Sequence, residues 1–322
     1  MNLKIKTTCV SLAFMTLTML MTSCNKDDVI DEKPSNGFRP VTPQSSASVS
    51  EVFEWTPAPG QFINDPTGGN SWPESMTPAQ AAAWAKERLA KRYTVSLGAF
   101  GGRIIAGFDH SVANTGGYEI GILGNAFLSA NGDSNEPGIV YVMQDTNGNG
   151  LPDDIWYELR GSDTFAEGTV RNYAVTYYRP EAPKQPVRWT DNLGNSGQIE
   201  YLGVYHDQPS YFPVWIKSDS YTLSGTRLEP RSFRNPETGN WSNPPFAWGY
   251  ADNIGEDNTI YDGETNCNRF RISDAIDLEG KSVKLDYIDF VGVQTALLFN
   301  AGHLGENSTE VRDIIDLTLY AR

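Results

Sequence analysis

Residues 145–154, DTNGNGLPDD, carry the clearest pattern for metal chemistry in this sequence. Oxygen-bearing side chains recur at alternate positions, glycines separate them, and two aspartates end the run. Ca²⁺ binds six to eight oxygens from carboxylates, amides and backbone carbonyls, at about 2.3–2.6 Å. The stretch therefore predicts calcium as a structural cofactor, with ligands from Asp145, Asn147, Asn149, Leu151, Asp153 and Asp154.

The same stretch is also typical of a tight hairpin. It resembles the first half of an EF-hand-type loop, but Trp156 stands where that loop has its last glutamate. Asn-Gly pairs favour tight turns because they adopt positive φ. The flanking segments GIVYVMQ and IWYELRG have the composition of two strands that would pair across such a turn. A calcium loop and a hairpin tip are compatible, and the sequence leaves both open.

Two aromatic stretches indicate a binding site for a ligand with flat apolar faces. They are YHDQPSYFPVWI at 205–216 and NWSNPPFAWGYADN at 240–253, where Asn and Asp alternate with rings. Exposed rings on loops can hold sugars or a large planar ligand, while the amides and carboxylates supply directional hydrogen bonds. The alternative is that the rings plug one end of the fold. The predicted ligand-binding residues are Asp109, His110, Tyr211, Trp215, Trp241, Trp248, Tyr250, Asp252 and Asn253.

Asp109 and His110 stand near an expected strand end in GFDHSV. They would serve as a base, a metal ligand or a sugar contact. The interpretation we favour is structural, with Asp109 capping a turn and His110 as a surface imidazole. The sequence contains no HExxH, CxxC or GxSxG, so zinc and serine-nucleophile chemistry have no support.

Catalysis is weakly indicated. A glycoside hydrolase needs two carboxyl groups roughly 5–9.5 Å apart. Nothing in the sequence ranks the acidic candidates, which are Glu54, Glu119, Glu136, Asp252 and Asp289. Cys267 is expected to be an inert, partly buried thiol rather than a nucleophile. We therefore expect a binding protein rather than an enzyme.

The elements that must position these residues are almost all strands. Short runs rich in Val, Ile, Tyr and Phe are separated by Gly, Asn, Asp or Pro. Alternation over residues 284–290 predicts a strand with one buried and one wet face. One helix is expected over 78–92, with Thr77 as its N-cap and Pro78 in its first turn. The predicted fold is an all-β antiparallel sandwich or jelly roll, with one short helix near the start of the domain.

The N-terminal region has the features of a targeting signal. Residues 1–23 have the pattern of a lipoprotein signal peptide, and LMTSC resembles a lipobox, so Cys24 is the expected site of lipidation. The NKDD that follows Cys24 resembles the surface-export signal of lipoproteins from Bacteroidota. Residues 24–50 are expected to be a flexible tether and 51–322 a single domain. These features predict an outer-membrane protein, lipid-anchored and facing the cell exterior.

Charge excludes one large class of partner. The formal net charge is −15, and a nucleic-acid-binding protein needs basic patches.

After the signal and Cys24, Cys267 is the remaining cysteine, so no disulfide can form within the domain. The folded part must be held by its core and by any bound metal.

The runs EWTPAPGQFIND, EPGIVYVMQDTNGNGLPDDIWYELRGS, PFAWGYADN and YIDFVGVQT resemble a Bacteroidota family of cell surface proteins. The likeness covers residues 51–322. Members resemble accessories of vitamin B12 capture systems, which work beside surface corrinoid-binding lipoproteins and a TonB-dependent outer-membrane transporter. The resemblance implies corrinoid binding for uptake with such a transporter, and it assigns no binding residue. A carbohydrate-binding surface module is the first alternative, and a glycoside hydrolase is the second.

Overall fold

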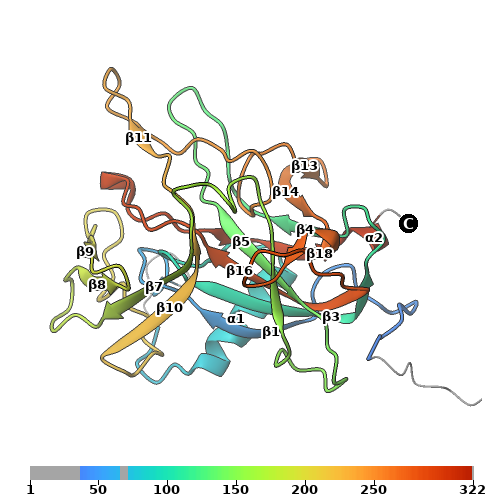
Figure 1. Ribbon diagram of the computed structural model, residues 1–322. Coiled ribbons are helices and arrows are strands. Elements are labelled where there is room, and N and C mark those ends of the chain that lie inside the picture. The colour runs from blue at the N-terminus through green and yellow to red at the C-terminus, as the bar shows by residue number, and fades with distance from the viewer. Residues whose placement is uncertain (1–36, 66–71, 321–322) are drawn as a thin grey trace, which may run out of the picture. The chain divides into compact units, whose positions relative to one another are not determined.

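A six-stranded antiparallel sheet lies at the centre of this computed structural model, which describes residues 37–65 and 72–320 (Figure 1). Every pairing between its strands is antiparallel. In spatial order the strands are β1 (Glu51–Thr56), β3 (Arg103–Ala113), β16 (Tyr287–Thr295), β5 (Gly138–Met143), β6 (Trp156–Leu159) and β15 (Ala275–Ile276).

A four-stranded sheet packs on one face of this central sheet. Its strands, in order, are β13 (Asn258–Tyr261), β14 (Thr265–Phe270), β4 (Ile120–Leu123) and β18 (Asp313–Asp316). Ile104 and Val293 of the central sheet lie in one buried apolar cluster with Ile122 and Ile314 of the second sheet. Two sheets that bury facing apolar side chains form a sandwich. The predicted all-β antiparallel sandwich is confirmed.

A second four-stranded sheet consists of β10 (Ser220–Arg227), β7 (Val170–Tyr178), β8 (Val187–Asp191) and β9 (Ser196–Ile199). Tyr173, Val175 and Leu223 from this sheet share a separate apolar cluster with Phe100. The small pairs are β11 (Phe233–Arg234) with β12 (Trp241–Ser242), and β2 (Val95–Ser96) with β17 (Glu310–Val311). Two 3₁₀ turns cover Ile272–Asp274 and Gly302–Leu304.

Helix α1 (Pro78–Ala90) begins where the sequence predicts and ends two residues before the predicted end. The Thr77 hydroxyl accepts from the Gln80 N–H, and the Gln80 side chain accepts from the Thr77 N–H. This reciprocal capping box satisfies two N–H groups that have no partner inside the helix. A second helix, α2 (Leu317–Tyr320), is a single turn. Neither helix within the described ranges has the length and apolar character needed to cross a bilayer.

Two expectations about the chain's organisation are wrong. Residues 37–50 are not a free tether, because the Arg39 guanidinium contacts the Asp289 carboxylate at 3.0 Å and Ser48 bridges to Ile315. In addition, β16 has no wet face, since all its residues are buried. At one end of β16, the segment that contains Arg39 covers the outer face of the strand. At the other end, β10 covers this face, and the Gln294 side-chain amide donates to the Ser224 carbonyl at 2.8 Å. The signal peptide and Cys24 lie outside the described residues.

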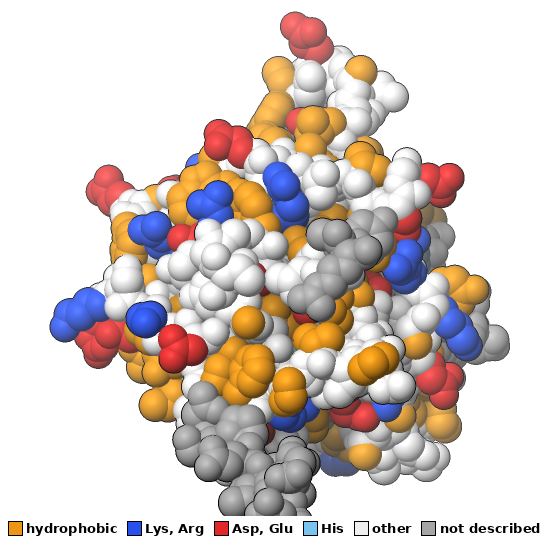
Figure 2. All heavy atoms as spheres, turned by 90° about the vertical axis from the view of Figure 1, so that its right-hand side faces the viewer, with side chains coloured by type: hydrophobic (Ala, Val, Ile, Leu, Met, Phe, Trp, Pro, Cys, Tyr) orange, Lys and Arg blue, Asp and Glu red, His pale blue; other side chains and the backbone are white. Residues whose placement is uncertain are grey.

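The acidic excess of the chain does not gather on the face seen from the right-hand side of Figure 1. Figure 2 shows Lys and Arg side chains interspersed there with Asp and Glu. Apolar side chains lie between them in small groups.

Candidate ligand-binding site

The outer face of the six-stranded sheet, opposite the sandwich core, is the floor of a cavity of about 570 Å³. Side chains alternate along each strand, so Ile104 and Ala106 of β3 enter the core while Arg103 and Ile105 face the cavity. This volume lies within the range that small-molecule sites occupy. The site is therefore placed on rigid strands rather than on loops.

Trp156 provides the aromatic surface of the cavity. It is partly exposed at the start of β6, and Gly292 lies beside it on β16. A Cβ added to Gly292 would lie 3.5 Å from the Trp156 ring and 3.6 Å from the Tyr141 Cβ. The missing side chain thus leaves room on the floor next to the indole. A flat apolar face beside an open floor is suited to a ring-shaped ligand.

Glu158 is the most unusual polar group in the cavity. It is 6% exposed, its Oε2 accepts from the Thr226 hydroxyl at 2.5 Å, and its Oε1 has no hydrogen-bond partner within the described part of the chain. Burial raises the pKa of Glu158, and the Thr226 hydroxyl and the Arg171 charge oppose that rise. A buried oxygen without a partner costs free energy unless a ligand or water satisfies it.

Further hydrogen-bonding groups surround Glu158. The Tyr141 hydroxyl donates to the Gln294 Oε1 at 3.3 Å, and burial raises the pKa of Tyr141, which keeps the phenol protonated. Arg171 of β7 donates to the backbone carbonyls of Asp277 and Leu278 across the cavity mouth. At the opposite side, Arg103 Nε and Glu54 Oε1 are 2.8 Å apart. The walls therefore offer donors and acceptors with opposite charges close to each other.

The 145–154 loop forms part of the rim. It joins β5 to β6, which pair antiparallel, so the predicted pairing of the two flanks is confirmed. The connection, residues 144–155, is longer than the tight turn expected, and positive φ falls on Gly148 and Gly150 rather than on the asparagines. Pro152 of the loop lines the cavity together with Trp156, which directly follows the loop. Any ligand that fixes this loop would therefore also fix one edge of the cavity.

Within the loop, the predicted metal ligands divide into two groups. The buried Asp145 carboxylate accepts from the backbone N–H groups of Gly148 and Gly150, each at 2.8 Å. Both glycines have positive φ, which lets the chain curl around the carboxylate. The Asp153 carboxylate accepts from the side-chain amides of Asn147 and Asn149 at 3.1 and 2.9 Å, and these bonds lower its pKa.

The remaining loop residues are placed differently. The Asp154 carboxylate accepts hydrogen bonds from the Thr146 hydroxyl and the Thr146 backbone N–H instead. Leu151 is half exposed and donates its N–H to the Asn149 side chain at 2.7 Å. Asp145, Asn147, Asn149 and Asp153 carry oxygens of the type that calcium prefers, and these oxygens accept hydrogen bonds from within the loop. Calcium at this loop stays a prediction.

Three of the predicted aromatic residues are in the core and present no open ring face. Tyr211, Trp215 and Tyr250 are each at most 2% exposed. Trp215 packs against Trp55 at 4.9 Å, and the Tyr250 hydroxyl accepts from the Asp163 N–H at 2.9 Å. For these rings the alternative interpretation, filling the fold, is correct. The stretches that contain them also hold Pro, and this does not distinguish a buried turn from an exposed one.

Trp241 and Trp248 are partly exposed but lie outside the main cavity. Trp241 contacts Phe299 edge to face at 5.7 Å. Trp248 lines a smaller cavity of about 270 Å³ beside Arg160 and Arg271. The predicted aromatic site is therefore not assembled as expected, and Trp156 provides the exposed ring of the larger cavity instead.

Asp109 and His110 lie in the middle of β3, not at a strand end. His110 is fully buried, so the expectation of a surface imidazole is wrong. Its Nδ1 is 2.7 Å from Asp109 and its Nε2 is 2.9 Å from Asp316. Burial disfavours the charged ring, but the hydrogen bonds and charges of Asp316 and Asp109 outweigh burial and raise the pKa of His110. This arrangement ties β3 to β18 and leaves the imidazole inaccessible to a ligand.

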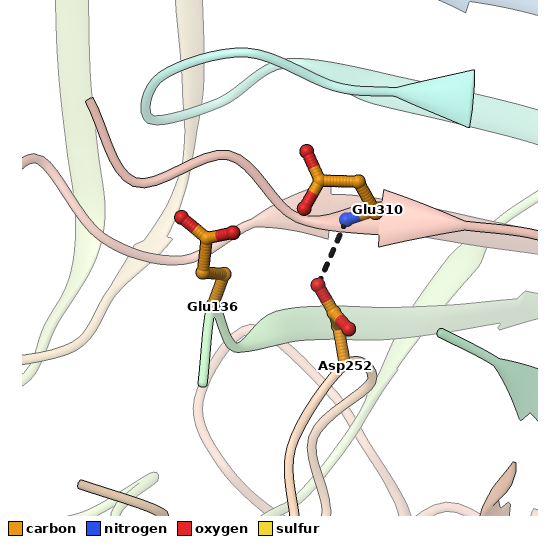
Figure 3. Close-up of side chains that lie close together, drawn as sticks. All are labelled: Glu136, Asp252 and Glu310. Carbon is orange, nitrogen blue, oxygen red and sulfur yellow. Dashed lines mark hydrogen bonds between the residues drawn. The ribbon is translucent and has the colours of Figure 1, made fainter. Parts of the chain in front are cut away.

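Asp252 and Asn253 are also buried and do not face the cavity. Asn253 exchanges two hydrogen bonds with the backbone of Phe246, at 2.8 and 2.9 Å, and so holds its own loop. Asp252 lies beside Glu136 and Glu310, and the ligand atoms of the three residues are all within 4.8 Å of one another (Figure 3). Glu136 and Asp252 were both among the unranked acidic candidates predicted from the sequence, whereas Glu310, which is distant from both in sequence, was not.

Two of the other carboxyl candidates are held by hydrogen bonds inside the fold. Glu119 is buried and accepts from Thr115, Gly117 and Ile272. Asp289 is buried against Arg39 and Ser111. Cys267 is completely buried, and burial raises the pKa of its thiol to about 12. Its inertness follows from that burial.

The comparisons with known proteins add no relative. A scan against protein-family models finds no match for this chain, and a search of the curated proteins finds none either. The cavity residues that sequence reasoning missed are Trp156, Glu158, Tyr141, Arg171 and Gln294. The one available signal was the position of Trp156 and Glu158 directly after the oxygen-rich loop.

Proposed function

We propose that this chain is a ligand-binding module without catalytic activity, and that the cavity on the outer face of the six-stranded sheet is its binding site. The observation that supports this most strongly is the combination of a 570 Å³ hollow, an accessible indole and a buried carboxyl oxygen without a partner. A concave apolar site with a few convergent polar groups is the usual form of a small-molecule site.

The walls favour a neutral ligand that carries hydroxyl or amide groups. Glu54 is neutralised by Arg103, and Arg171 lies close enough to Glu158 to act on its pKa. A ligand with a net charge would be attracted by one residue of each of these pairs and repelled by the other. A neutral ligand with several donors and acceptors would pair with Glu158, Asn172 and Ser224 at the cavity wall while one of its apolar faces contacts Trp156.

Corrinoid capture at the cell surface is the function we propose on the basis of the sequence resemblance. In it the protein is lipid-anchored through Cys24 in the outer membrane and works beside a TonB-dependent transporter. A corrinoid is larger than this cavity, so it would insert one amide-bearing edge and leave the rest outside. A short glycan fits the volume more fully, and glycan binding is the second candidate. Both are amphipathic ligands of the class that the walls favour.

The direct test is calorimetric titration of cyanocobalamin, and separately of soluble di- to tetrasaccharides, into the purified full-length protein. Saturable binding of one probe identifies the ligand class. The matched variant is Gly292→Leu, which fills the floor beside Trp156, with Gly292→Ala as the smaller control and circular dichroism to verify folding. Binding that survives unchanged in a folded Gly292→Leu protein would place the ligand elsewhere.

Two carboxyl groups, Glu54 and Glu158, line the same cavity, which is the minimal equipment of a glycosidase. We assign them to binding, because Glu54 is held by Arg103 and Glu158 by Thr226. Release of reducing sugar by the wild-type protein, and its loss in Glu158→Gln, would contradict that assignment.

A further inference from the structure

Three carboxylates from distant parts of the chain converge at one point, where Asp252 and Glu310 are buried and Glu136 is half-buried. Glu136 precedes β5, Asp252 lies in the loop before β13, and Glu310 lies in β17. Their side chains point toward one another in Figure 3, and one oxygen of each lies within 4.8 Å of the others. The cluster therefore lies where three chain segments meet, and backbone hydrogen bonds from Glu136 to the Asp252 carbonyl and from Glu310 to the Asp252 carboxylate also connect them.

The backbone is shaped to bring Asp252 to this point. Asp252 has φ of +52°, a left-handed conformation that few residues other than glycine adopt. Its Oδ1 accepts from the N–H groups of Asn125 and Ala126, and its Oδ2 accepts from the Glu310 N–H at 3.0 Å. Gly124 permits this approach, since a Cβ there would lie 2.5 Å from the Asp252 carboxylate. These hydrogen bonds hold the Asp252 carboxylate in one orientation.

The cluster has no counter-ion from the part of the chain that the structure describes. Within the described ranges, no Lys or Arg forms an ion pair with Glu136, Asp252 or Glu310. Asp252 and Glu310 are 1% and 4% exposed. Bringing charged carboxylates together out of water without a cation is strongly unfavourable.

A second observation, separate from the acidic cluster itself, points to a missing partner. Asn307 is 1% exposed, and its Nδ2 donates to the Glu136 Oε1 at 3.4 Å, so its amide lies against the cluster. The Oδ1 of this amide has no hydrogen-bond partner in the described part of the chain, and neither has the Oε2 of Glu310. Buried oxygens that lack a donor are available to a cation.

We propose that Glu136, Asp252 and Glu310 form a binding site for a divalent cation of the calcium class, with the Asn307 side chain beside them. The three carboxylates offer oxygens, and carboxylate oxygens are ligands that hard cations select. The site is distinct from the 145–154 loop and independent of the ligand cavity. Its effect is to clamp the start of β5, the loop before β13 and β17 together.

Protons are the competing occupants. Burial raises the pKa of Asp252 to about 7, with the Glu136 charge adding to the rise, and burial also raises the pKa values of Glu136 and Glu310. A cation must therefore displace protons from the carboxyl groups, and its affinity falls as the pH drops below 7.

The test uses the full-length protein stripped with EDTA, and compares melting temperatures at pH 7.5 in EDTA, Ca²⁺ and Mg²⁺. The variants are Glu310→Gln for the cluster and Asp153→Asn for the loop. A cation at about 100 times its Kd raises the Tm of the wild type by about 5 °C. Glu310→Gln loses most of this rise, because it removes one of the three carboxylate ligands. Asp153→Asn keeps the cluster's share of the rise.

Calorimetric titration of Ca²⁺ into Asp153→Asn gives a second readout that does not depend on the folding of Glu310→Gln. The expected result is at least one site per chain that releases protons on binding and weakens at pH 5.5. No calcium effect in the wild type, or a rise that Glu310→Gln retains and Asp153→Asn abolishes, would overturn the assignment and leave protons as the occupants of the cluster.

Discussion

Replacing Glu306 by Gln will change how the stability of the protein depends on pH. Glu306 is 3% exposed, its Oε1 accepts from the Gln61 N–H at 2.8 Å, and its Oε2 has no partner within the described ranges. Burial raises its pKa to about 8; the Gln61 N–H opposes that rise and the Glu136 charge adds to it. Glutamine has the same shape and keeps the acceptor for Gln61, so the variant removes mainly the ability to ionise.

The magnitude follows from the two pKa values. In the unfolded chain the carboxyl titrates near 4.5, whereas in the folded protein it does so near 8. The folded state therefore holds the proton more tightly, and stability falls as pH rises from about 4.5 to about 8. At about 1.36 kcal/mol per pKa unit, the wild type loses about 4 to 5 kcal/mol between pH 4 and pH 9 through this group. Glu306→Gln does not lose it.

The assay is urea unfolding of both proteins, followed by tryptophan fluorescence at pH 4 and pH 9 in EDTA. The quantity of interest is the change, between the two pH values, in the difference of their free energies of unfolding. A constant cost of the new amide cancels in this comparison. Glu237→Gln, at an exposed position, is the matched control and should show no such change. A Glu306→Gln protein that follows the wild type at both pH values would refute the burial argument.

Three further outcomes are expected. Arg39→Ala should lower the free energy of unfolding by about 2 to 4 kcal/mol in chemical denaturation, because it leaves the Asp289 carboxylate buried without its cation. An unchanged free energy of unfolding would indicate that residues 37–50 do not stabilise the domain. Iodoacetamide should label Cys267 only in denaturant, since the thiol is buried and its pKa is raised to about 12. Mass spectrometry after labelling measures this, and a label on Cys267 of the native protein would contradict the prediction. Cys24→Ala should move the protein from the membrane to the soluble fraction of fractionated cells, and retention in the membrane would contradict lipidation at this residue.

The features that sequence predicts correctly are local. Thr77, Pro78 and Gln80 lie within four residues, and together they determine where α1 starts. The β5–β6 hairpin follows from two adjacent strand-like runs around Asn-Gly pairs. Antiparallel β structure follows from short runs between turn residues, without knowledge of which runs pair.

The features that sequence misses depend on contacts between distant segments. Tyr211 and Trp215 resemble exposed loop aromatics in sequence, and only the packing of Trp215 on Trp55 shows that this part is core. The convergence of Asp252 with Glu310 depends on the placement of β17 beside β2, which no local pattern encodes. Glu158 is one more acidic residue in a chain with 40, and its cavity exists only once β7 and β10 stand beside the central sheet.

The most direct test of the ligand cavity is a parallel calorimetric titration of cyanocobalamin, or of the oligosaccharide that binds if cyanocobalamin does not, into wild type, Trp156→Ala and Trp189→Ala. Trp189 is a partly exposed indole on β8, away from the residues that line the cavity, and so it controls for the general loss of a tryptophan. Removal of the indole that contacts the ligand should weaken binding at least tenfold, which corresponds to about 1.4 kcal/mol. The predicted result is weakened binding in Trp156→Ala and unchanged binding in Trp189→Ala. Equal affinity in all three proteins, or no binding of any probe to the wild type, would contradict the assignment of the cavity as the binding site.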